Sequence, residues 1–401
     1  MNKKIPLGIS ITLIITSITA TFAITMSIAK GIYSQMITDL TQRSQQYEAI
    51  EDVAIKSRDF YWRTDINDLT HLSSTVKGYI DGLDDPYGCY MDAEAYAEYM
   101  KRMQGQMQGI GAVTALNPQT GRMQITEVFA NSPAEKSGLK RGDVVLKIED
   151  EAVTAANYDD MAEKLKGRRL TSVRITYGRG DQEITEKVML GYNHQSVTSK
   201  LIGDIGYIKI TAFYQNAVPD FKKAVDSLVK QQARALIFDL RNTTEGDIRY
   251  AAEIIAYLVP LPTEGSKAIA TLVRPDGSIL ETYTSDPNSV AQPMAVLVNG
   301  RTVGLAELFA CDLRDYGKAS LVGEQTRGNG SYQKLYRLKE GGAMLLTVAM
   351  IKPYISEGYH ETGLTPDVLA ELTPEQEKNF ELLSPEQDPQ LQLALTLFAE
   401  R

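Results

Sequence analysis

The chain has 401 residues, more than one ordinary domain core needs, so two or three domains are expected. Hydrophobic residues make up 43% of it and charged residues 23%, as in folded globular proteins. The net charge of −9 argues against nucleic acid as a partner, because phosphate binding needs clustered Lys and Arg. His71, His194, His360, Cys89 and Cys311 show no metal-ligand spacing, so the sequence predicts no metal site, and it gives no sign of a cofactor.

The N-terminus predicts a membrane segment. After Lys3 and Lys4, residues 5–29 are uncharged and rich in Ile, Thr and Ala, which is long enough for a helix across a bilayer. Lysines before such a segment favour a cytoplasmic N-terminus, so we expect a single-pass membrane protein with extracytoplasmic globular domains. The alternative is a secreted protein released by signal cleavage after Ser27-Ile28-Ala29.

Residues 30–103 are predicted to be a helical N-terminal region. Apolar residues recur at helical spacing in residues 36–62 and again in residues 66–83, before the turn "DDPYG". The acidic stretch "MDAEAYAEYMKRMQG" predicts a further short helix.

Residues 104–190 carry a different pattern, in which short alternating runs are separated by Gly, Pro and Asn, as in strands and turns. "SPAEKSGL" predicts a short helix with Ser132 as N-cap and Pro133 at its first position. "KRGDVVLKIEDEAV" predicts a turn and a strand hairpin, and "NYDDMAEKLKG" predicts a helix that ends at Gly167.

This ordered set of motifs resembles a PDZ domain, a small β-barrel-like fold. The resemblance makes Gly109, Ile110, Gly111 and Ala112 the peptide-binding residues. Backbone amides of such a glycine-rich loop form a nest for a terminal carboxylate, and the following strand accepts the peptide by β-augmentation.

Residues 191–372 alternate apolar strands with amphipathic helices, which predicts an α/β core with a largely parallel, buried sheet. One helix is expected to bury Phe221, Val225, Leu228 and Val229 on a single face. "GGAMLLTVAMIKPYISEG" predicts a hairpin. Residues 373–401 form a predicted helical tail, in which the apolar positions 391, 393, 395 and 397 either support dimerisation or pack within the chain. The fold class is thus multidomain α/β (α+β).

The motifs "LDDPYGCYMD", "IFDLRNTTEG", "VLVNGRTVGLAELFACDLRDYGKASLVGEQTRGNGSYQ" and "GLTPD" together resemble the S41 serine peptidases, the carboxyl-terminal processing or tail-specific proteases. The resemblance extends from about residue 40 to the C-terminus. It implies an exported, often membrane-anchored endopeptidase whose PDZ domain reads substrate C-termini and whose Ser–Lys dyad cleaves them.

The residues that the resemblance assigns to catalysis are degenerate here. Aligned on Asn299-Gly300 and Glu307, the nucleophile position falls on Gly304, and the "GKG" lysine position falls on Asn329. The helper Gln333 remains. In the oxyanion loop, which ends at Gly246, Glu245 stands where the family has glycine, and its carboxylate has the wrong sign beside an oxyanion.

We therefore interpret the sequence as that of a pseudopeptidase that binds protein C-termini or extended peptides, which leaves its status as an enzyme open. The alternative is an active endopeptidase with a dyad relocated to Ser331, Lys334 or Thr302. A third hypothesis is a regulatory subunit in a heteromer with an active paralogue, and a homodimer is also compatible with the sequence.

Overall fold

The computed structural model describes residues 7–62, 68–106, 108–129, 131–167, 171–193, 195–260, 268–284 and 289–399. The predicted roles of Lys3, Lys4 and His194 concern positions outside these described residues. The chain divides into two compact units, residues 1–76 and 77–401.

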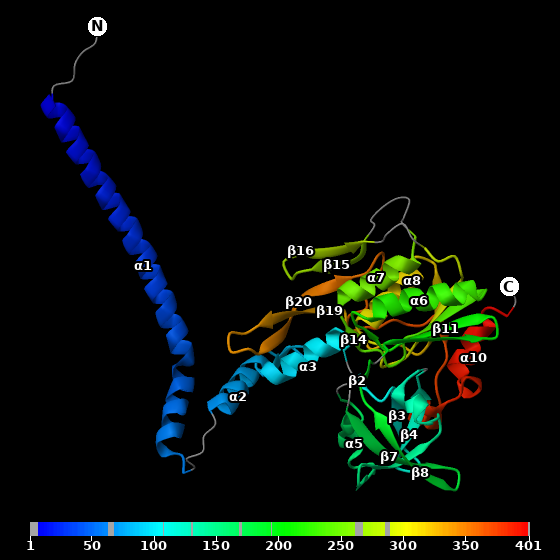
Figure 1. The fold of residues 1–401 in the computed structure, drawn as a ribbon. Coiled ribbons are helices and arrows are strands. Elements are labelled where there is room, and N and C mark those ends of the chain that lie inside the picture. The colour runs from blue at the N-terminus through cyan, green and yellow to red at the C-terminus, as the bar shows by residue number, and fades with distance from the viewer. Residues whose placement is uncertain are drawn as a thin grey trace. The chain divides into compact units, whose positions relative to one another are not determined.

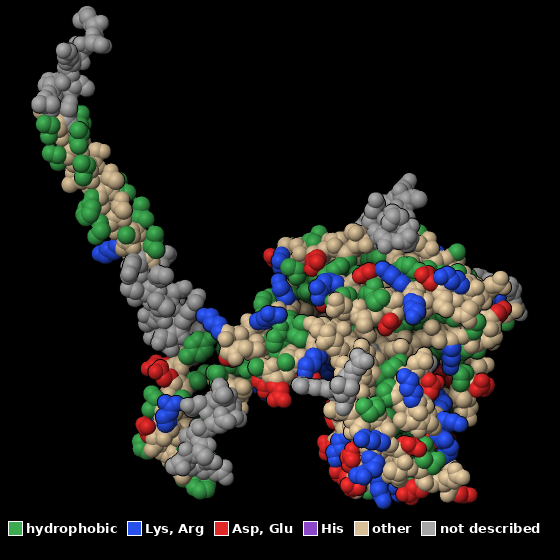
Figure 2. Space-filling view, in the orientation of Figure 1, with side chains coloured by type: hydrophobic (Ala, Val, Ile, Leu, Met, Phe, Trp, Pro, Cys, Tyr) green, Lys and Arg blue, Asp and Glu red, His purple; other side chains and the backbone are tan. Residues whose placement is uncertain are grey.

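The first unit is dominated by α1 (Leu7–Phe60), and α2 (Asp68–Asp81) begins near its end. The stretch Ile11–Ile32 of α1 is apolar and long enough to cross a membrane, and hydrophobic side chains run along it in Figure 2. Its side chains are exposed: Phe22, for example, keeps 66% of its surface accessible. At a rise of 1.5 Å per residue, 22 helical residues span about 33 Å, close to the thickness of a hydrocarbon core. This helix is consistent with a signal sequence or a membrane anchor.

Residues 108–193 of the second unit form a β-rich part (Figure 1). Its main sheet has the order β3-β4-β5-β7-β8, with β6 on β5 and a separate β2-β9 pair. All these pairings are antiparallel. Its elements are β2 (Gln108–Gly109), β3 (Ala112–Asn117), β4 (Arg122–Val128), α4 (Pro133–Lys136), β5 (Val144–Ile148), β6 (Glu151–Ala152), α5 (Tyr158–Lys164), β7 (Ser172–Arg179), β8 (Gln182–Met189) and β9 (Tyr192–Asn193).

The predictions of α4, of the β5–β6 hairpin and of a helix after Asn157 are confirmed, but α5 ends at Lys164 and not at Gly167. Ser132 caps α4, since its Oγ accepts a hydrogen bond from the Glu135 amide at 3.1 Å, and Pro133 is the first residue of the helix. The sheet encloses its own core, because alternate residues such as Met123, Ile125 and Ile175 are fully buried.

The α/β part contains a six-stranded sheet of order β10-β11-β13-β17-β18-β21. Only β10 is antiparallel to its neighbour, so the prediction of a largely parallel sheet is confirmed. Its strands and helices are β10 (Val197–Ile202), β11 (Ile205–Ile210), α6 (Ala217–Lys230), β13 (Ala235–Asp239), α7 (Ile248–Leu258), β17 (Met294–Val298), α8 (Leu305–Asp315), β18 (Ala319–Gly323), β21 (Val368–Leu369) and, in the tail, α9 (Pro374–Lys378), the 3-10 turns η1 (Phe380–Leu382) and η2 (Pro385–Gln387), and α10 (Pro389–Thr396).

Helices cover both faces of this sheet, which explains its nearly continuous apolar strands. Leu236 and Phe238 of β13 face the core shared with α6, α7 and α8. Ile237, between them, faces the opposite core, where α10 packs. Leu391 of α10 is buried in that second core and the other tail leucines pack against it, so this apolar face is used within the chain.

The prediction that Val229 lies on the buried face of its helix is wrong, since 37% of its surface is exposed. The buried face of α6 follows the spacing of Phe221, Val225 and Leu228, and Val229 is one residue, or about 100°, beyond Leu228.

The sequence predictions did not include most of a second sheet. Its strand order is β1-β20-β15-β16, and β19 also pairs with β20. The predicted hairpin within residues 341–358 is wrong: β20 is one continuous strand there, and its hairpin partner is the preceding β19. The predicted helical N-terminal region also contains a strand, β1, which pairs with β20, followed by α3. The elements are β1 (Cys89–Met91), α3 (Ala93–Met103), β15 (Ala268–Val273), β16 (Ile279–Thr284), β19 (Ser331–Arg337) and β20 (Ala343–Lys352).

Candidate functional site

The corner between β17 and α8 carries Gly304, the position that the resemblance assigns to a nucleophile. Gly304 caps α8 with φ 71° and ψ −113°, a backbone conformation that residues with a Cβ rarely adopt. A Cβ atom at this position would have space, since the nearest atom, the Asn329 carbonyl oxygen, would lie 4.0 Å away. The corner is therefore a sharp strand-to-helix turn with open space, and no side chain, at position 304.

Glu307 fixes this corner against the loop that follows β18. Its buried carboxylate accepts hydrogen bonds from the Gly304 amide at 2.9 Å and the Asn329 amide at 2.9 Å. The Gly328 amide donates to it at 2.6 Å and the Thr326 hydroxyl at 2.5 Å. Positions 304 and 329, 25 residues apart, are thus held side by side by one carboxylate.

Asn329, at the position that the resemblance assigns to a general base, ends a chain of polar contacts. Its Oδ1 accepts from the Ser331 amide at 3.0 Å and the Ser331 hydroxyl at 2.5 Å. Gln333 donates to the Ser331 Oγ at 2.7 Å and to the Thr347 Oγ1 at 3.2 Å. The Thr347 hydroxyl donates in turn to Asp85 at 2.9 Å. The amide oxygen of Asn329 is therefore an occupied acceptor in a satisfied network, and an amide cannot act as a base.

The predicted oxyanion loop lies against the same corner. The Val303 amide donates to the Thr243 carbonyl at 3.1 Å, which ties the loop to the residue before Gly304. The end of the loop forms β14 (Glu245–Gly246), which pairs with β12 (Ala212–Phe213). Gly246 has to be glycine, because a Cβ there would lie 2.5 Å from the Phe213 Cβ.

Glu245 does not present a bare charge to the site. Its carboxylate accepts a short hydrogen bond from the Tyr214 hydroxyl and forms an ion pair with the Arg102 Nε at 3.3 Å. Burial and then the bond to Glu245 raise the pKa of Tyr214 well above its ordinary value. Burial and the charge of Asp247 raise the pKa of the neighbouring Tyr99 to about 12. Both phenols stay protonated at neutral pH, and Arg102 on α3 offsets the charge that the sequence alone placed beside an oxyanion.

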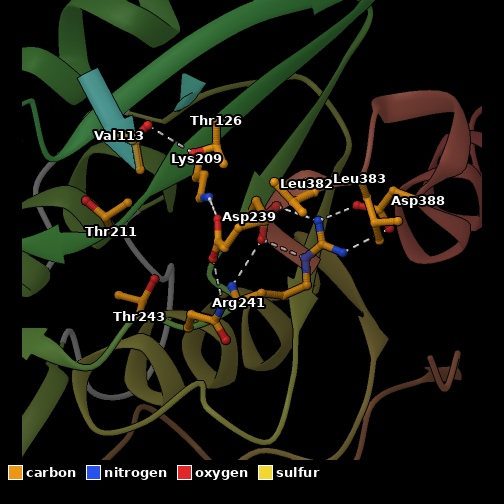
Figure 3. A network of polar contacts seen from close by, with 12 residues as sticks. Val113, Thr126, Lys209, Thr211, Asp239, Arg241, Thr243, Leu382, Leu383 and Asp388 are labelled. Carbon is orange, nitrogen blue, oxygen red and sulfur yellow. Dashed lines mark hydrogen bonds and ion pairs between the residues drawn. The ribbon is translucent and has the colours of Figure 1, made fainter. Parts of the chain in front are cut away.

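Behind the loop lies a buried charge network that sequence reasoning missed (Figure 3). The Arg241 guanidinium donates to Asp239 at 2.6 Å and to Asp388 at 2.7 Å, and the Tyr207 hydroxyl donates to Asp239 at 2.6 Å. Burial raises the pKa of Asp239, but the charge and hydrogen bonds of Arg241 outweigh it and hold this pKa below its usual range. The sequence feature that could have predicted this network is the pair of charged residues, Asp239 and Arg241, at the end of an apolar strand.

The tail also reaches the loop. Asn242 donates to Glu381 at 3.0 Å, and the Arg241 guanidinium lies over the Phe380 ring at 4.7 Å. Two cavities flank this tail segment, of about 430 and about 650 Å³. Arg141, from the β-rich part, donates to the carbonyls of Leu382 at 3.1 Å and Leu383 at 3.0 Å. The segment 380–383 thus contacts both the β-rich part and the candidate oxyanion loop.

The residues considered for a relocated dyad do not form one. The Ser331 hydroxyl is engaged with Asn329 and Gln333. Thr302 is fully buried and its hydroxyl donates to the Leu240 carbonyl at 3.0 Å. Lys334 is exposed, and in β19 it is one residue beyond Gln333, so its side chain leaves the opposite face of the strand.

The predicted peptide-binding residues line a groove of about 200 Å³ between β3 and α5, which we call the peptide groove. Gly109, Ile110, Gly111 and Ala112 all line it, although the Ile110 side chain is buried in the β-rich core. The Ile110 amide is already bonded to the Leu165 carbonyl at 3.2 Å, so it is not free for a carboxylate. Within the described ranges, no group of three or more His, Cys, Asp or Glu is placed to hold a metal ion.

Comparisons with known proteins agree with this architecture. The model of peptidase family S41 matches residues 204–370, and that of the PDZ domain matches residues 124–179, downstream of the glycine-rich loop. The carboxy-terminal processing protease CtpA of Bacillus subtilis (strain 168) is 29% identical over 324 residues, which cover 79% of this chain and 67% of that protein. The carboxyl-terminal-processing protease of Picosynechococcus sp. is 29% identical over 326 residues, covering 79% and 77%.

Among solved structures, a putative S41 protease from Bacteroides fragilis superposes with a TM-score of 0.60 at 17% identity, covering 86% of this chain and 96% of that one. At this identity the likeness concerns the fold. Both family models and the curated relatives lead to one conclusion: the chain combines a peptidase S41 domain with a PDZ domain and is a homologue of the CtpA-like carboxyl-terminal processing proteases.

Proposed function

We propose that this protein is a pseudopeptidase of the S41 family that binds protein C-termini or extended peptides without cleaving them. The observation that carries the proposal is the pair of residues at the candidate dyad. Gly304 has no hydroxyl, and the Asn329 amide oxygen accepts from Ser331.

The chemistry of a Ser–Lys dyad explains why this pair is decisive. A serine hydroxyl must lose its proton as it attacks, and a neutral lysine must receive that proton. Removal of one member of a serine protease's catalytic residues can cost about a millionfold in turnover. Here neither the nucleophile nor the base is available at the positions that Glu307 holds together.

Binding would then be the remaining activity of the two domains. The peptide groove would place a terminal carboxylate at its glycine-rich loop and an extended chain along the edge of β3. The apolar stretch Ile11–Ile32 would tether the protein to the cell membrane with its domains outside the cytoplasm. In that position the protein would act alone, as a homodimer, or as a regulator paired with an active paralogue. The mass of the chain isolated from membranes tests the tether, because cleavage after Ala29 would remove it.

Proteolysis by the full-length chain in detergent micelles tests the proposal. We expect no cleavage of an unstructured protein, read by mass spectrometry. Gly304→Ser/Asn329→Lys and the same variant with Glu245→Gly are the matched gain-of-function arms, since position 304 has space for a side chain. Cleavage by the double variant but not by the native chain would identify residues 304 and 329 as the missing chemistry, and cleavage by the triple variant only would add residue 245.

Cleavage by the native chain would contradict the proposal if it persists through purification. Ser331→Ala and Lys334→Ala would then show whether a relocated dyad is responsible, because each should abolish such an activity.

A further inference from the structure

Helix α5 is fastened to β3 and its preceding loop at both ends of the peptide groove. At the C-terminal end of α5, the Leu165 carbonyl accepts from the Ile110 amide at 3.2 Å, and the Gly167 amide donates to the Gln108 carbonyl at 2.8 Å. At its N-terminal end, the Tyr158 hydroxyl donates to the Thr114 carbonyl at 2.9 Å. The groove lies between these two attachments.

The Tyr158 hydroxyl donates to the Thr114 carbonyl, a backbone group that a peptide would need for pairing with β3 by β-augmentation. One edge of β3 pairs with β4, so a peptide has to pair with the other edge, which faces α5. Residues two apart along a strand offer their backbone groups to the same edge, so Ala112 and Thr114 serve the same partner strand. The Thr114 carbonyl is already occupied by the phenol.

The size of the groove agrees with an obstructed site. Its volume of about 200 Å³ is below the roughly 300–1,000 Å³ of ordinary ligand pockets. Thr114 is the last residue of β3 that lines it. As it stands, the groove can accept the end of a peptide beside Ala112 but not a strand that continues past Thr114.

We propose that Tyr158 is a latch on the peptide groove, whose hydroxyl must leave the Thr114 carbonyl before a peptide can extend along β3. This inference rests on the proposed peptide-binding function and adds the residue that selects for peptide length. The ring of Tyr158 packs against the β-rich core, so only the hydroxyl, and not the ring, acts as the latch.

Tyr158→Phe tests the latch because it removes the hydroxyl and keeps the ring. A neutral hydrogen bond contributes about 1 kcal/mol net, so its loss should raise the affinity of a long peptide about fivefold. The probe is a fluorescent octapeptide ending in valine with a free carboxylate, followed by anisotropy with the full-length chain in detergent micelles. A valine dipeptide, measured as a competitor, is too short to reach Thr114 and should bind both chains equally.

Two further variants complete the experiment. Tyr257→Phe removes a hydroxyl that donates to Asp226 on α6, away from the groove, and should change neither affinity. Tyr158→Leu also lacks the hydroxyl and should reproduce the length dependence if the phenylalanine variant folds poorly.

The outcomes separate the latch from the function on which it rests. A gain for the octapeptide alone supports the latch. An unchanged affinity, or an equal change for both lengths, overturns the latch while peptide binding stands. Absence of binding by every chain, or equal binding of the carboxyl-amidated octapeptide, overturns terminal-carboxylate capture and the latch with it.

Discussion

Two glycines of the candidate site, Gly304 and Gly246, are required for different physical reasons. Gly304 holds φ 71° in open space, so the obstacle to a larger residue is backbone strain alone. Gly246 holds φ 155° and also touches Phe213, whose carbonyl oxygen would lie 2.8 Å from an added Cβ. A serine at position 304 would have to bear the strain that glycine avoids.

We therefore expect Gly304→Ala to be tolerated better than Gly246→Ala. The first should cost about 1–3 kcal/mol from strain. The second adds a steric overlap that forces β12 and β14 apart, for a further loss of about 1–3 kcal/mol. Thermal unfolding of the two variants provides the measurement, each serving as the other's control. Equal midpoints would contradict the assignment of free space at Gly304.

At the scale of elements, α8 anchors the loop that passes beside the site. Its buried Asp312 accepts from the Tyr354 amide at 3.1 Å, and Asp315 accepts from the Ser356 amide at 2.8 Å. This loop continues to Tyr359, whose hydroxyl donates to the Gly304 carbonyl at 2.9 Å. Burial, together with the charge of Asp315, raises the pKa of Asp312 well above its ordinary value despite the Tyr354 amide.

The raised pKa predicts a pH-dependent effect of Asp312→Asn. Below the unfolded-state pKa of about 3.9 the carboxyl is neutral in both states and has no linkage effect. As the pH rises above it, only the unfolded chain ionises, so Asp312 increasingly destabilises the fold until the folded pKa is reached.

Asparagine keeps the acceptor for Tyr354 and cannot ionise. The melting temperature of Asp312→Asn relative to the native chain should therefore rise between pH 4 and pH 8. Asp315→Asn is the comparison variant, since it removes the other carboxylate that anchors this loop and should weaken the contacts with Ser356. The prediction would be contradicted if the melting temperature of Asp312→Asn relative to the native chain fell as the pH is raised.

At the scale of the whole second unit, the tail segment 380–383 joins the PDZ domain to the S41 domain. Arg141 donates to the Thr126 carbonyl of its own domain and to the Leu382 and Leu383 carbonyls of the tail. Glu381 meets Asn242 of the candidate oxyanion loop on the other side. Movement of the PDZ domain would therefore displace the tail segment and, through it, the candidate oxyanion loop.

Arg141→Ala should release the tail from the PDZ domain. Hydrogen bonds to a charged donor contribute about 1.5–3 kcal/mol each, so hydrogen–deuterium exchange in residues 380–388 should accelerate at least severalfold. Arg174→Ala is the control, because Arg174 pairs with Glu149 and Asp150 inside the PDZ domain. Exchange that is the same in both variants would show that Arg141 does not hold the tail.

The sequence by itself determined the features that depend on local pattern and residue identity. Apolar strands and amphipathic helices predicted the parallel sheet, and the capping residues Ser132 and Pro133 predicted α4. The sequence also shows directly that position 304 has no hydroxyl and that position 329 has no basic group, because both follow from the residue types Gly304 and Asn329. Strand β1 was not predicted because it has three residues and pairs with the distant β20, and β16 was not predicted because its residues are exposed or half-buried.

Only the tertiary structure decided which charges and donors meet. Arg102 compensates Glu245 from 143 positions away in the chain, and Arg241 finds Asp388 147 positions away. Tyr158 reaches the carbonyl of Thr114 across the peptide groove. Periodicity reports which face of an element is buried, but not which distant element covers it. The folded chain sets those contacts, because the free energy of a charge or a hydrogen-bonding group depends on the partner that packing brings to it.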